Sequence, residues 1–515
     1  MALFLGSCAS AAAGTPLPDA KALPIPANGW SREKLAQHVL SRAAFGPSPA
    51  DREYVEAVSA GAWLYEQLSP GVDAALEQRL AAEFPTLQLS VTQALQQFPS
   101  VRERAKAMGI EDKDEARKLF AARPYELPRQ LVLELTQAKL LRAVKSRRQL
   151  EEVLVDFWFN HFNVSAEKGR ARWLLPSYER DAIRPFVFGK FRDMLGATAR
   201  HPAMLVYLDN WMSVRDGLQV PALRRAVGLN ENYARELLEL HTLGVDAGYT
   251  QADVREAARV LTGWSMELKR KDDDWGEFLY RRAAHDTGPK RVFGLELPAG
   301  GQMDDGERLL DYLASHPKTA RHLCFKLAQK FVSDEPPAQL VDALAAEYLR
   351  TGGDLRAVYV MLFGARAFWA DAAFAAKTKT PLELVASSVR ALGDLTLVQP
   401  QLVKAIDAMG QPLYRSTPPT GYAEVASAWV SAGALVSRIN FGLALARNDV
   451  AGVQVPLDSL PAGTADEVID ALSLRLLGAK LTGDSRRTVL AAVEDPADPR
   501  VVAGLLIGSP EFQKQ

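Results

Sequence analysis

The chain has 515 residues, of which 48% are hydrophobic and 24% are charged, and its formal net charge is −1. This is an ordinary globular composition, and the near-zero charge gives no electrostatic signature of a nucleic-acid partner. The only two cysteines, Cys8 and Cys324, exclude a disulfide framework and a cysteine-rich zinc site. No run of about 18 apolar residues predicts a transmembrane segment.

The N-terminal segment, residues 1–28, has the character of a secretory signal remnant followed by a tether. Leu5 to Cys8 approximates a bacterial lipobox, in which the cysteine becomes a lipid anchor, and a small-residue stretch follows it. The four-residue apolar core is short for a signal, so either the true start lies upstream or the likeness is accidental. We expect an exported protein that is periplasmic, an outer-membrane lipoprotein, or secreted.

The remaining sequence predicts a mainly α protein, an irregular multi-helix bundle with one small β-hairpin insertion near residues 276–294. Helical periodicity recurs along most of the chain, with Pro and Gly as breaks. Two short segments, at 278–280 and 291–293, are predicted to pair as the hairpin. The expected helices cover residues 31–42, 48–69, 74–150, 306–350, 353–394 and 422–447, whereas residues 400–420 are expected to be a loop.

The chain is expected to divide into a main helical domain at 29–447, a linker at 448–464, and C-terminal helices at 465–515 packed on the main domain. The linker is inferred from its Pro, Gly and small polar residues. No chemistry is apparent in the C-terminal parts.

The motif at 230–264 contains the densest set of reactive side chains. Asn230 is a plausible N-cap of a helix that ends at Gly244, and Thr250 opens a second helix with a capping-box variant. Within the first helix, one face carries Asn232, Glu236 and Glu239, and Tyr233, Arg235 and His241 lie nearby.

These side chains permit two interpretations. Two carboxylates at i and i+3 could bind a cation or divide acid and base roles, with Glu236, Glu239, His241, Arg235 and Tyr233 as catalytic candidates and Asn232 contacting substrate. Alternatively, Arg235 pairs with Glu239 and His241 caps the helix C-terminus, and the motif is structural.

Two further motifs add candidates. In LVDFWFNHFNVS, at 154–165, four aromatic residues surround His161 and Asn160, and a histidine in such surroundings needs a hydrogen-bond partner or a metal. In the turn at 285–289, His285 and Asp286 could contact substrate or a metal. Alternatively, the Asp286 side chain could form a hydrogen bond with the backbone of its own turn. His38, among apolar neighbours, is expected to be structural.

Known catalytic signatures are absent from the sequence. There is no dinucleotide-binding glycine motif, phosphate-binding loop, nucleophile elbow or His-Glu-x-x-His. If the protein binds a divalent transition metal, we expect its ligands to be His161, Glu236, Glu239 and His241, since no known metal signature offers another set.

With these motifs laid out, the chain resembles the bacterial family catalogued as domain of unknown function 1800. The resemblance covers nearly the whole chain, through HVLSRAAFGP, DFWFNHFNVS, GLNENYARELLELHTLGVDAGYTQADVREAARVLTGW, HDTGPK and PPTGYAEVASAWVSAGALVSRINF. One departure is Phe186, where the family often has a histidine.

The resemblance implies an exported bacterial protein, often encoded beside an exported protein distantly similar to sulfatases, and no established activity. Two hypotheses follow. The first is a metal-dependent or acid/base enzyme acting on an envelope or extracellular polymer. The second is a non-catalytic scaffold or binding partner of the sulfatase-like protein. A redox or haem role comes third.

Overall fold

The computed structural model describes residues 21–121, 127–218, 228–270, 272–456, 459–494 and 496–515. Cys8, expected to carry a lipid anchor, lies outside these residues. The described residues form 24 α-helices and three two-stranded sheets, so the predicted mainly α fold is confirmed. None of the described helices is long and apolar enough to cross a bilayer.

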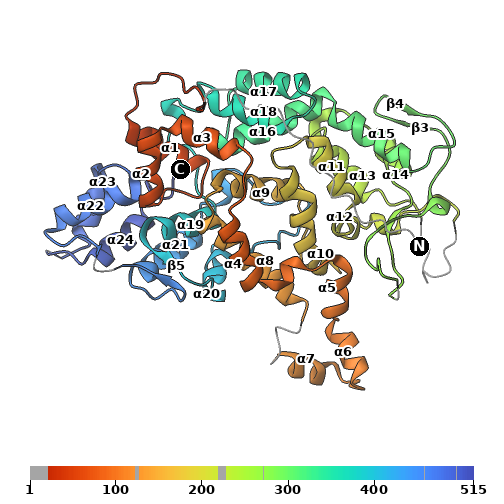
Figure 1. Ribbon diagram of the computed structural model, residues 1–515, viewed down its shortest axis with the longest axis horizontal. Coiled ribbons are helices and arrows are strands. Elements are labelled where there is room, and N and C mark those ends of the chain that lie inside the picture. Colours follow the sequence, from red (N-terminus) through yellow and green to blue (C-terminus); the bar gives the residue numbers. More distant parts are fainter. Residues whose placement is uncertain (1–20, 122–126, 219–227, 271, 457–458, 495) are drawn as a thin grey trace.

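Figure 1 shows the helices in chain order, and longer connections separate α12 from α13, α14 from α15, and α20 from α21. The first nine are α1 (Arg32–Arg42), α2 (Pro49–Val58), α3 (Ala60–Leu68), α4 (Ala74–Glu83), α5 (Val91–Gln97), α6 (Val101–Ala107), α7 (Lys113–Ala121), α8 (Arg129–Lys145) and α9 (Gln149–His161). The next eight are α10 (Ala171–Ser177), α11 (Phe191–Arg200), α12 (Pro202–Tyr207), α13 (Asn232–Glu236), α14 (Gln251–Val260), α15 (Met303–Ala314), α16 (Pro317–Phe331) and α17 (Ala338–Arg350). The last seven are α18 (Leu355–Gly364), α19 (Pro381–Leu392), α20 (Pro400–Ala408), α21 (Ala432–Ala446), α22 (Ala465–Leu477), α23 (Gly483–Ala491) and α24 (Pro499–Gly508).

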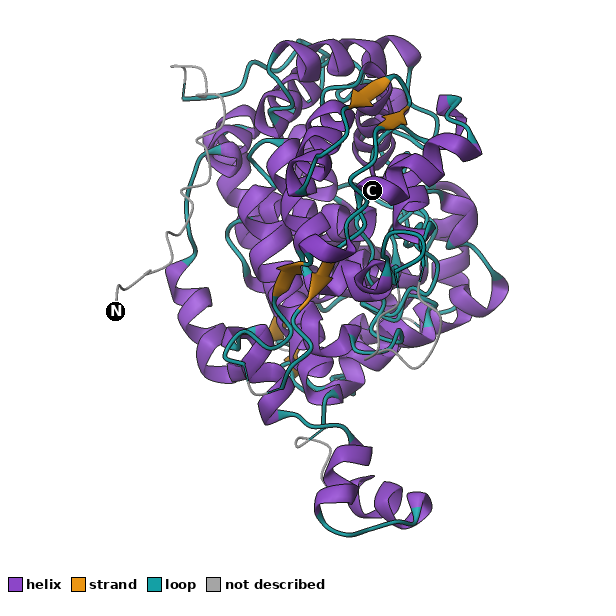
Figure 2. Cartoon of the chain, turned by 90° about the vertical axis from the view of Figure 1, so that its right-hand side faces the viewer, coloured by secondary structure: helices purple, strands orange, loops and turns teal. Residues whose placement is uncertain are grey.

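Helix α9 lies in the middle of the molecule (Figure 1). Its Phe157, Trp158 and Phe159 are buried in one continuous hydrophobic core. Trp158 also donates a hydrogen bond from Nε1 to the hydroxyl of Tyr359 at 2.7 Å. Helices α6 and α7 instead project from the body of the molecule, as both views show (Figures 1 and 2).

The β structure confirms the predicted strand positions but not their pairing. Strand β2 (Phe278–Tyr280) pairs with β1 (Trp264–Met266), and β3 (Lys290–Val292) pairs with β4 (Leu295–Leu297), both antiparallel. The two segments expected to form one hairpin therefore belong to two. The prediction missed β1, a three-residue strand soon after α14, because it is too short to show strand periodicity. It missed β4 because the turn at Phe293 and Gly294 lacks the Asn-Gly or Asp-Gly signature of a two-residue hairpin.

Three helix boundaries also differ from the prediction. The segment 48–69 is broken at Ser59, which has a φ of 91° and caps α3. Residues 400–408 form α20, because Pro400 occupies the first turn, where proline is tolerated. The predicted helix at 422–447 is regular only from Ala432, since Ser431 caps it.

The C-terminal helices contact the preceding ones: α24 packs against α21 and α22, and α22 also touches α19. The predicted linker contains β6 (Val453–Gln454), which pairs with β5 (Asp394–Leu395). The division into domains stays a prediction.

At the other end of the described chain, α1 is held by residues far along the sequence. Arg42 donates to the carbonyls of Val332 and Ala373 at 2.6 and 3.0 Å. His38 Nε2 donates to the carbonyl of Phe368 at 2.8 Å, and its ring is buried, but its Nδ1 has no hydrogen-bond partner within the described residues, so the expected structural role stays a prediction.

Candidate functional site

The central motif changes helix type within itself. Asn230 Oδ1 accepts from the amide of Asn232, but the N-cap position belongs to Glu231, whose side chain makes no capping bond, so the predicted cap at Asn230 is wrong by one residue. Helix α13 then runs only to Glu236. The next turn, Leu237–His241, is π-helical, a rare form that often marks functional sites. The segment ends at His241, with Thr242 at its C-cap position, three residues before the predicted stop at Gly244. Gly244 does have a positive φ, +93°, but it precedes the next turn, Val245–Ala247.

The polar face of α13 makes contacts other than those expected. Arg235 pairs with Gln251 at 2.8 Å and with Glu231 at 3.6 Å, so the predicted Arg235–Glu239 pair is wrong. Glu239 instead accepts from the hydroxyl of Tyr249 at 3.2 Å. Burial, and then repulsion by Glu239, raise the pKa of Glu236 above its ordinary value. Asn232 is exposed.

The two predicted histidines come together in the core. The rings of His161 and His241 lie 6.2 Å apart, and His161 Nε2 contacts the backbone carbonyl of His241 at 3.1 Å. Tyr233, which is buried, has its ring 6.3 Å from that of His241. His161 and His241 thus form one cluster, to which Tyr233 is a neighbour.

Two residues of α16 complete this cluster. Lys326 donates from Nζ to His161 Nδ1 at 3.0 Å, and the ring of His322 lies 6.3 Å from that of His161. His322 Nε2 contacts the carbonyl of Leu240 at 3.2 Å. His161 and His241 are buried, whereas His322 and Lys326 are partly exposed, so the cluster reaches from the core to the surface.

Burial and mutual repulsion keep the imidazoles neutral. Desolvation, followed by the charge of Lys326, lowers the pKa of His241 to about 3 and that of His322 to about 4, and holds the pKa of His161 well below its ordinary value. Desolvation also lowers the pKa of Lys326 to about 8, and the charge of Glu424 opposes that shift. The lysine is therefore the group of the cluster that changes charge nearest neutral pH.

The structure does not assemble the predicted transition-metal site. No three His, Cys, Asp or Glu side chains of the described residues are arranged to hold a metal. Both nitrogens of His161 are engaged, one with a carbonyl and one with an ammonium group. The described residues do not bring His161, Glu236, Glu239 and His241 together as one ligand set, and metal binding by them stays a prediction.

Against this geometry we set the comparison with known proteins. A family model described as "Protein of unknown function (DUF1800)" matches residues 38–514. The chain belongs to this family. No curated protein and no solved structure matches it.

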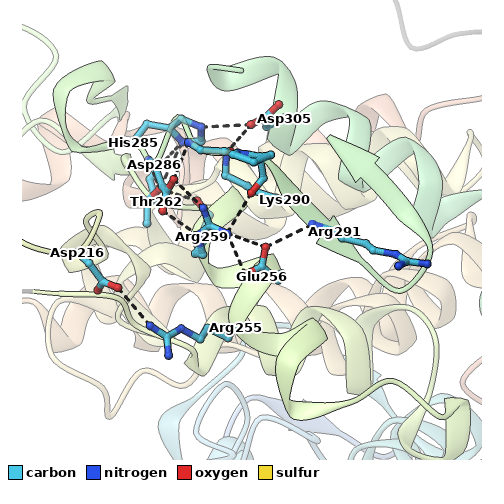
Figure 3. A network of polar contacts seen from close by, with 12 residues as sticks. Asp216, Arg255, Glu256, Arg259, Thr262, His285, Asp286, Lys290, Arg291 and Asp305 are labelled. Carbon is cyan, nitrogen blue, oxygen red and sulfur yellow. Dashed lines mark hydrogen bonds and ion pairs between the residues drawn. The ribbon is translucent and has the colours of Figure 1, made fainter. Parts of the chain in front are cut away.

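In this DUF1800 protein, the HDTGPK turn is held by ion pairs and hydrogen bonds to neighbouring residues (Figure 3). Asp286 accepts from Arg259 through both oxygens, at 2.8 and 3.0 Å, and from the amide of Gly288. His285 is buried, contacts the carbonyl of Thr262 at 2.9 Å, and has Asp305 3.5 Å from its Nε2. These contacts match the structural interpretation of the turn, and substrate binding by His285 and Asp286 stays a prediction.

Asn160 is likewise engaged with the backbone. Its Nδ2 donates to the carbonyl of Tyr422 and its Oδ1 accepts from the amide of the same residue, both at 2.7 Å. The side chain thereby fixes the loop before α21. Its predicted role as a substrate contact also stays a prediction.

Sequence reasoning missed Lys326 and His322. They stand four residues apart in RHLCFKLAQK, within a helix that otherwise shows an ordinary amphipathic pattern. The i, i+4 spacing of a histidine and a lysine on one face was the available signal. The same spacing is typical of a solvent-exposed helix face. Only the contacts of α16 with His161 show that His322 and Lys326 belong to the cluster.

Proposed function

We propose that this chain is an exported bacterial acid–base enzyme in which Lys326 transfers the proton. The observation that carries the proposal is the 3.0 Å contact between Lys326 Nζ and His161 Nδ1 in a cluster that reaches the surface. Because both nitrogens of His161 are engaged, acid–base chemistry is favoured over the metal-dependent alternative.

The hydrogen bonds support a separate role for each group. His161 Nε2–H donates to the carbonyl of His241, which leaves Nδ1 as an acceptor for one N–H of Lys326. The uncharged amine of Lys326 keeps a lone pair that accepts a proton from a substrate O–H or C–H group. The resulting ammonium is stabilised by His161 Nδ1 and by the charge of Glu424. Lys326 is the proposed catalytic residue and His161 a positioning residue.

The proposed substrate class rests on the proposed location of the protein outside the cytoplasm. The lipobox-like Leu5–Cys8 segment and the family resemblance both favour export, and polymers are the abundant substrates of the envelope and its surroundings. We therefore propose an envelope or extracellular polymer as the substrate.

The first test incubates the protein with bacterial envelope polysaccharide fractions and follows new chain ends by mass spectrometry. The rate should rise with pH through about 8 and then level off, because the base acts in its unprotonated form. Lys326→Met should abolish the reaction, and Lys326→Arg should not restore it, since arginine stays charged.

Lys318→Met provides the matched control, because Lys318 is an exposed lysine of the same helix. It should leave the rate and its pH profile unchanged. A folded Lys326→Met protein that retains the wild-type rate would overturn the proposal.

A second candidate function, binding of a co-encoded exported sulfatase-like protein, is favoured by one surface feature. Val430, Leu435 and Val436 have exposed fractions of 69, 46 and 57% at the start of α21, inside a family motif. Clustered exposed apolar side chains are typical of interaction sites.

Co-purification of the two co-expressed proteins tests this candidate. Leu435→Glu should abolish the complex. Leu474→Glu, at an equally exposed leucine of α22, should not. Equal co-purification with both variants would exclude the surface at α21.

A further inference from the structure

A cavity of about 400 Å³ lies between α1, the end of α22 and the segment 510–515. In Figure 1 these parts meet on the left side of the molecule, where the C-terminus lies beside α1. The wall is largely apolar and includes Phe374, Leu476, Leu477, Leu481 and Phe512. A cavity with an apolar wall and a few polar groups is the usual form of a small-molecule site.

One of those polar groups is a lysine without an anionic partner. The Lys379 residue is only 5% exposed and its Nζ lies 3.7 Å from the centre of the Phe512 ring. Within the described residues, no carboxylate or other acceptor bonds this Nζ, although the backbone of Lys379 is held on both sides by Gln513 and Arg438. A buried cation normally has a partner, because burial without one is costly.

His38 adds a second polar feature to the same wall. Its Nε2 is used by the carbonyl of Phe368, and its buried Nδ1 has no hydrogen-bond partner in the described part of the chain. Within the residues that the structure describes, the cavity therefore combines an apolar wall, a lysine whose Nζ contacts the Phe512 ring but no anion, and a ring nitrogen without a hydrogen-bond partner.

We propose that this cavity binds a small amphiphilic carboxylate, whose apolar body contacts the leucine and phenylalanine wall and whose carboxylate pairs with Lys379. Charge complementarity favours an anion, because Lys379 and Lys514 line this cavity and Glu511 is the one acidic side chain among its described lining residues. The paired carboxylate supplies the partner that Lys379 lacks in the protein. The proposal is independent of the Lys326 site.

Binding should be coupled to proton uptake. Desolvation lowers the pKa of Lys379 to about 7. The negative charge of Glu383 opposes this shift, whereas the positive charge of Arg438 adds to it. His38, with a pKa of about 3, stays neutral in this range. A bound carboxylate raises the lysine pKa, so at pH 8 the complex takes up a proton that the free protein lacks.

The test uses octanoate and 1-octanol, which share an alkyl chain, in isothermal titration calorimetry on the full-length chain. Octanoate should bind at least about tenfold more tightly than octanol, since a charge-assisted bond is gained. In buffers of different ionisation enthalpy, octanoate binding should take up close to one proton at pH 8 and almost none at pH 5.5.

Lys379→Met should remove both the preference for octanoate and the proton uptake. Lys480→Met is the control, because this exposed lysine lines the same cavity but already pairs with Asp470. Should Lys379→Met not fold, proton uptake by the wild-type protein still decides the matter. Absence of octanoate binding, equal affinity for octanol, or binding without proton uptake at pH 8 would overturn the proposal.

Discussion

Asn160 shows how a side chain in a reactive-looking motif serves the fold. Its amide forms two bonds of 2.7 Å with the backbone of Tyr422, which is 262 residues away. The neighbouring Gly421 fits against it so closely that a Cβ there would lie 2.4 Å from Asn160 Oδ1. This contact positions the loop that precedes α21.

We therefore predict that Asn160→Ala lowers the free energy of unfolding by about 2–3 kcal/mol, because it leaves the Tyr422 amide and carbonyl without their partner. Urea denaturation provides the measurement. The exposed Asn232→Ala, in α13, should change stability by no more than about 0.5 kcal/mol. Equal effects of the two substitutions would show that the Tyr422 contact adds nothing to stability.

At the scale of elements, the π-helical turn Leu237–His241 brings the carbonyls of Leu240 and His241 to the imidazoles of His322 and His161. Gly244 lies three residues beyond the end of this turn, and a Cβ there would lie 3.0 Å from His322 Nδ1. The position thus needs glycine for its φ and for the space beside the ring.

Gly244→Ala should therefore destabilise the protein more than Gly248→Ala does. Both glycines have positive φ, but at Gly248 a Cβ would meet only Lys318 Nζ at 3.9 Å. Gly248→Ala should lose about 1 kcal/mol for its left-handed backbone. Gly244→Ala should lose about 1–3 kcal/mol because its φ of 93° and ψ of 157° are almost confined to glycine, and about 1–2 kcal/mol more for the contact with His322. Thermal or urea unfolding of the pair measures the difference, and equal losses would contradict a close fit at His322.

Elements whose signals are local could be predicted from the sequence, whereas features created by packing could not. Ser31 and Thr250 cap their helices, as their sequence context indicates. Strands β1 and β2 are not joined by a two-residue turn, so the short hairpin signature that marks such a pair in a sequence is missing. In the candidate site, His161 and His241 were found from their motifs, but Lys326 joins them only through the docking of α16.

On the scale of the whole molecule, the seven histidines behave alike. Each has a pKa below its ordinary value, with burial as the largest cause. A folded pKa below the unfolded value of about 6.5 means that the unfolded chain binds protons first as the pH falls. Their contribution to stability is complete above pH 6.5 and is lost as the pH falls toward the folded values, about 3 for His38, His201 and His241.

The free energy of unfolding should therefore fall between pH 7 and pH 5, by about 2 kcal/mol for each fully buried histidine. Lys326 and Lys379, whose pKa values are lowered to about 8 and about 7, act in the same direction above neutral pH, so stability should still rise on the alkaline side. Urea titrations at pH 5, 7 and 8.5 test this trend. A flat profile from pH 7 to 5 would contradict it.

The anchoring of α1 has a consequence for the order in which the protein folds. His38 and Arg42 bond carbonyls that lie 290 to 331 residues further along the chain, so this helix cannot bury its inner face until most of the polypeptide has been synthesised. Contacts over such sequence distances close late and slow the search for the native state. During translation the apolar face of α1 therefore stays exposed to solvent until its partners have been synthesised. That interval is when a chaperone, or a translocation channel that takes unfolded chains, would find the polypeptide most accessible.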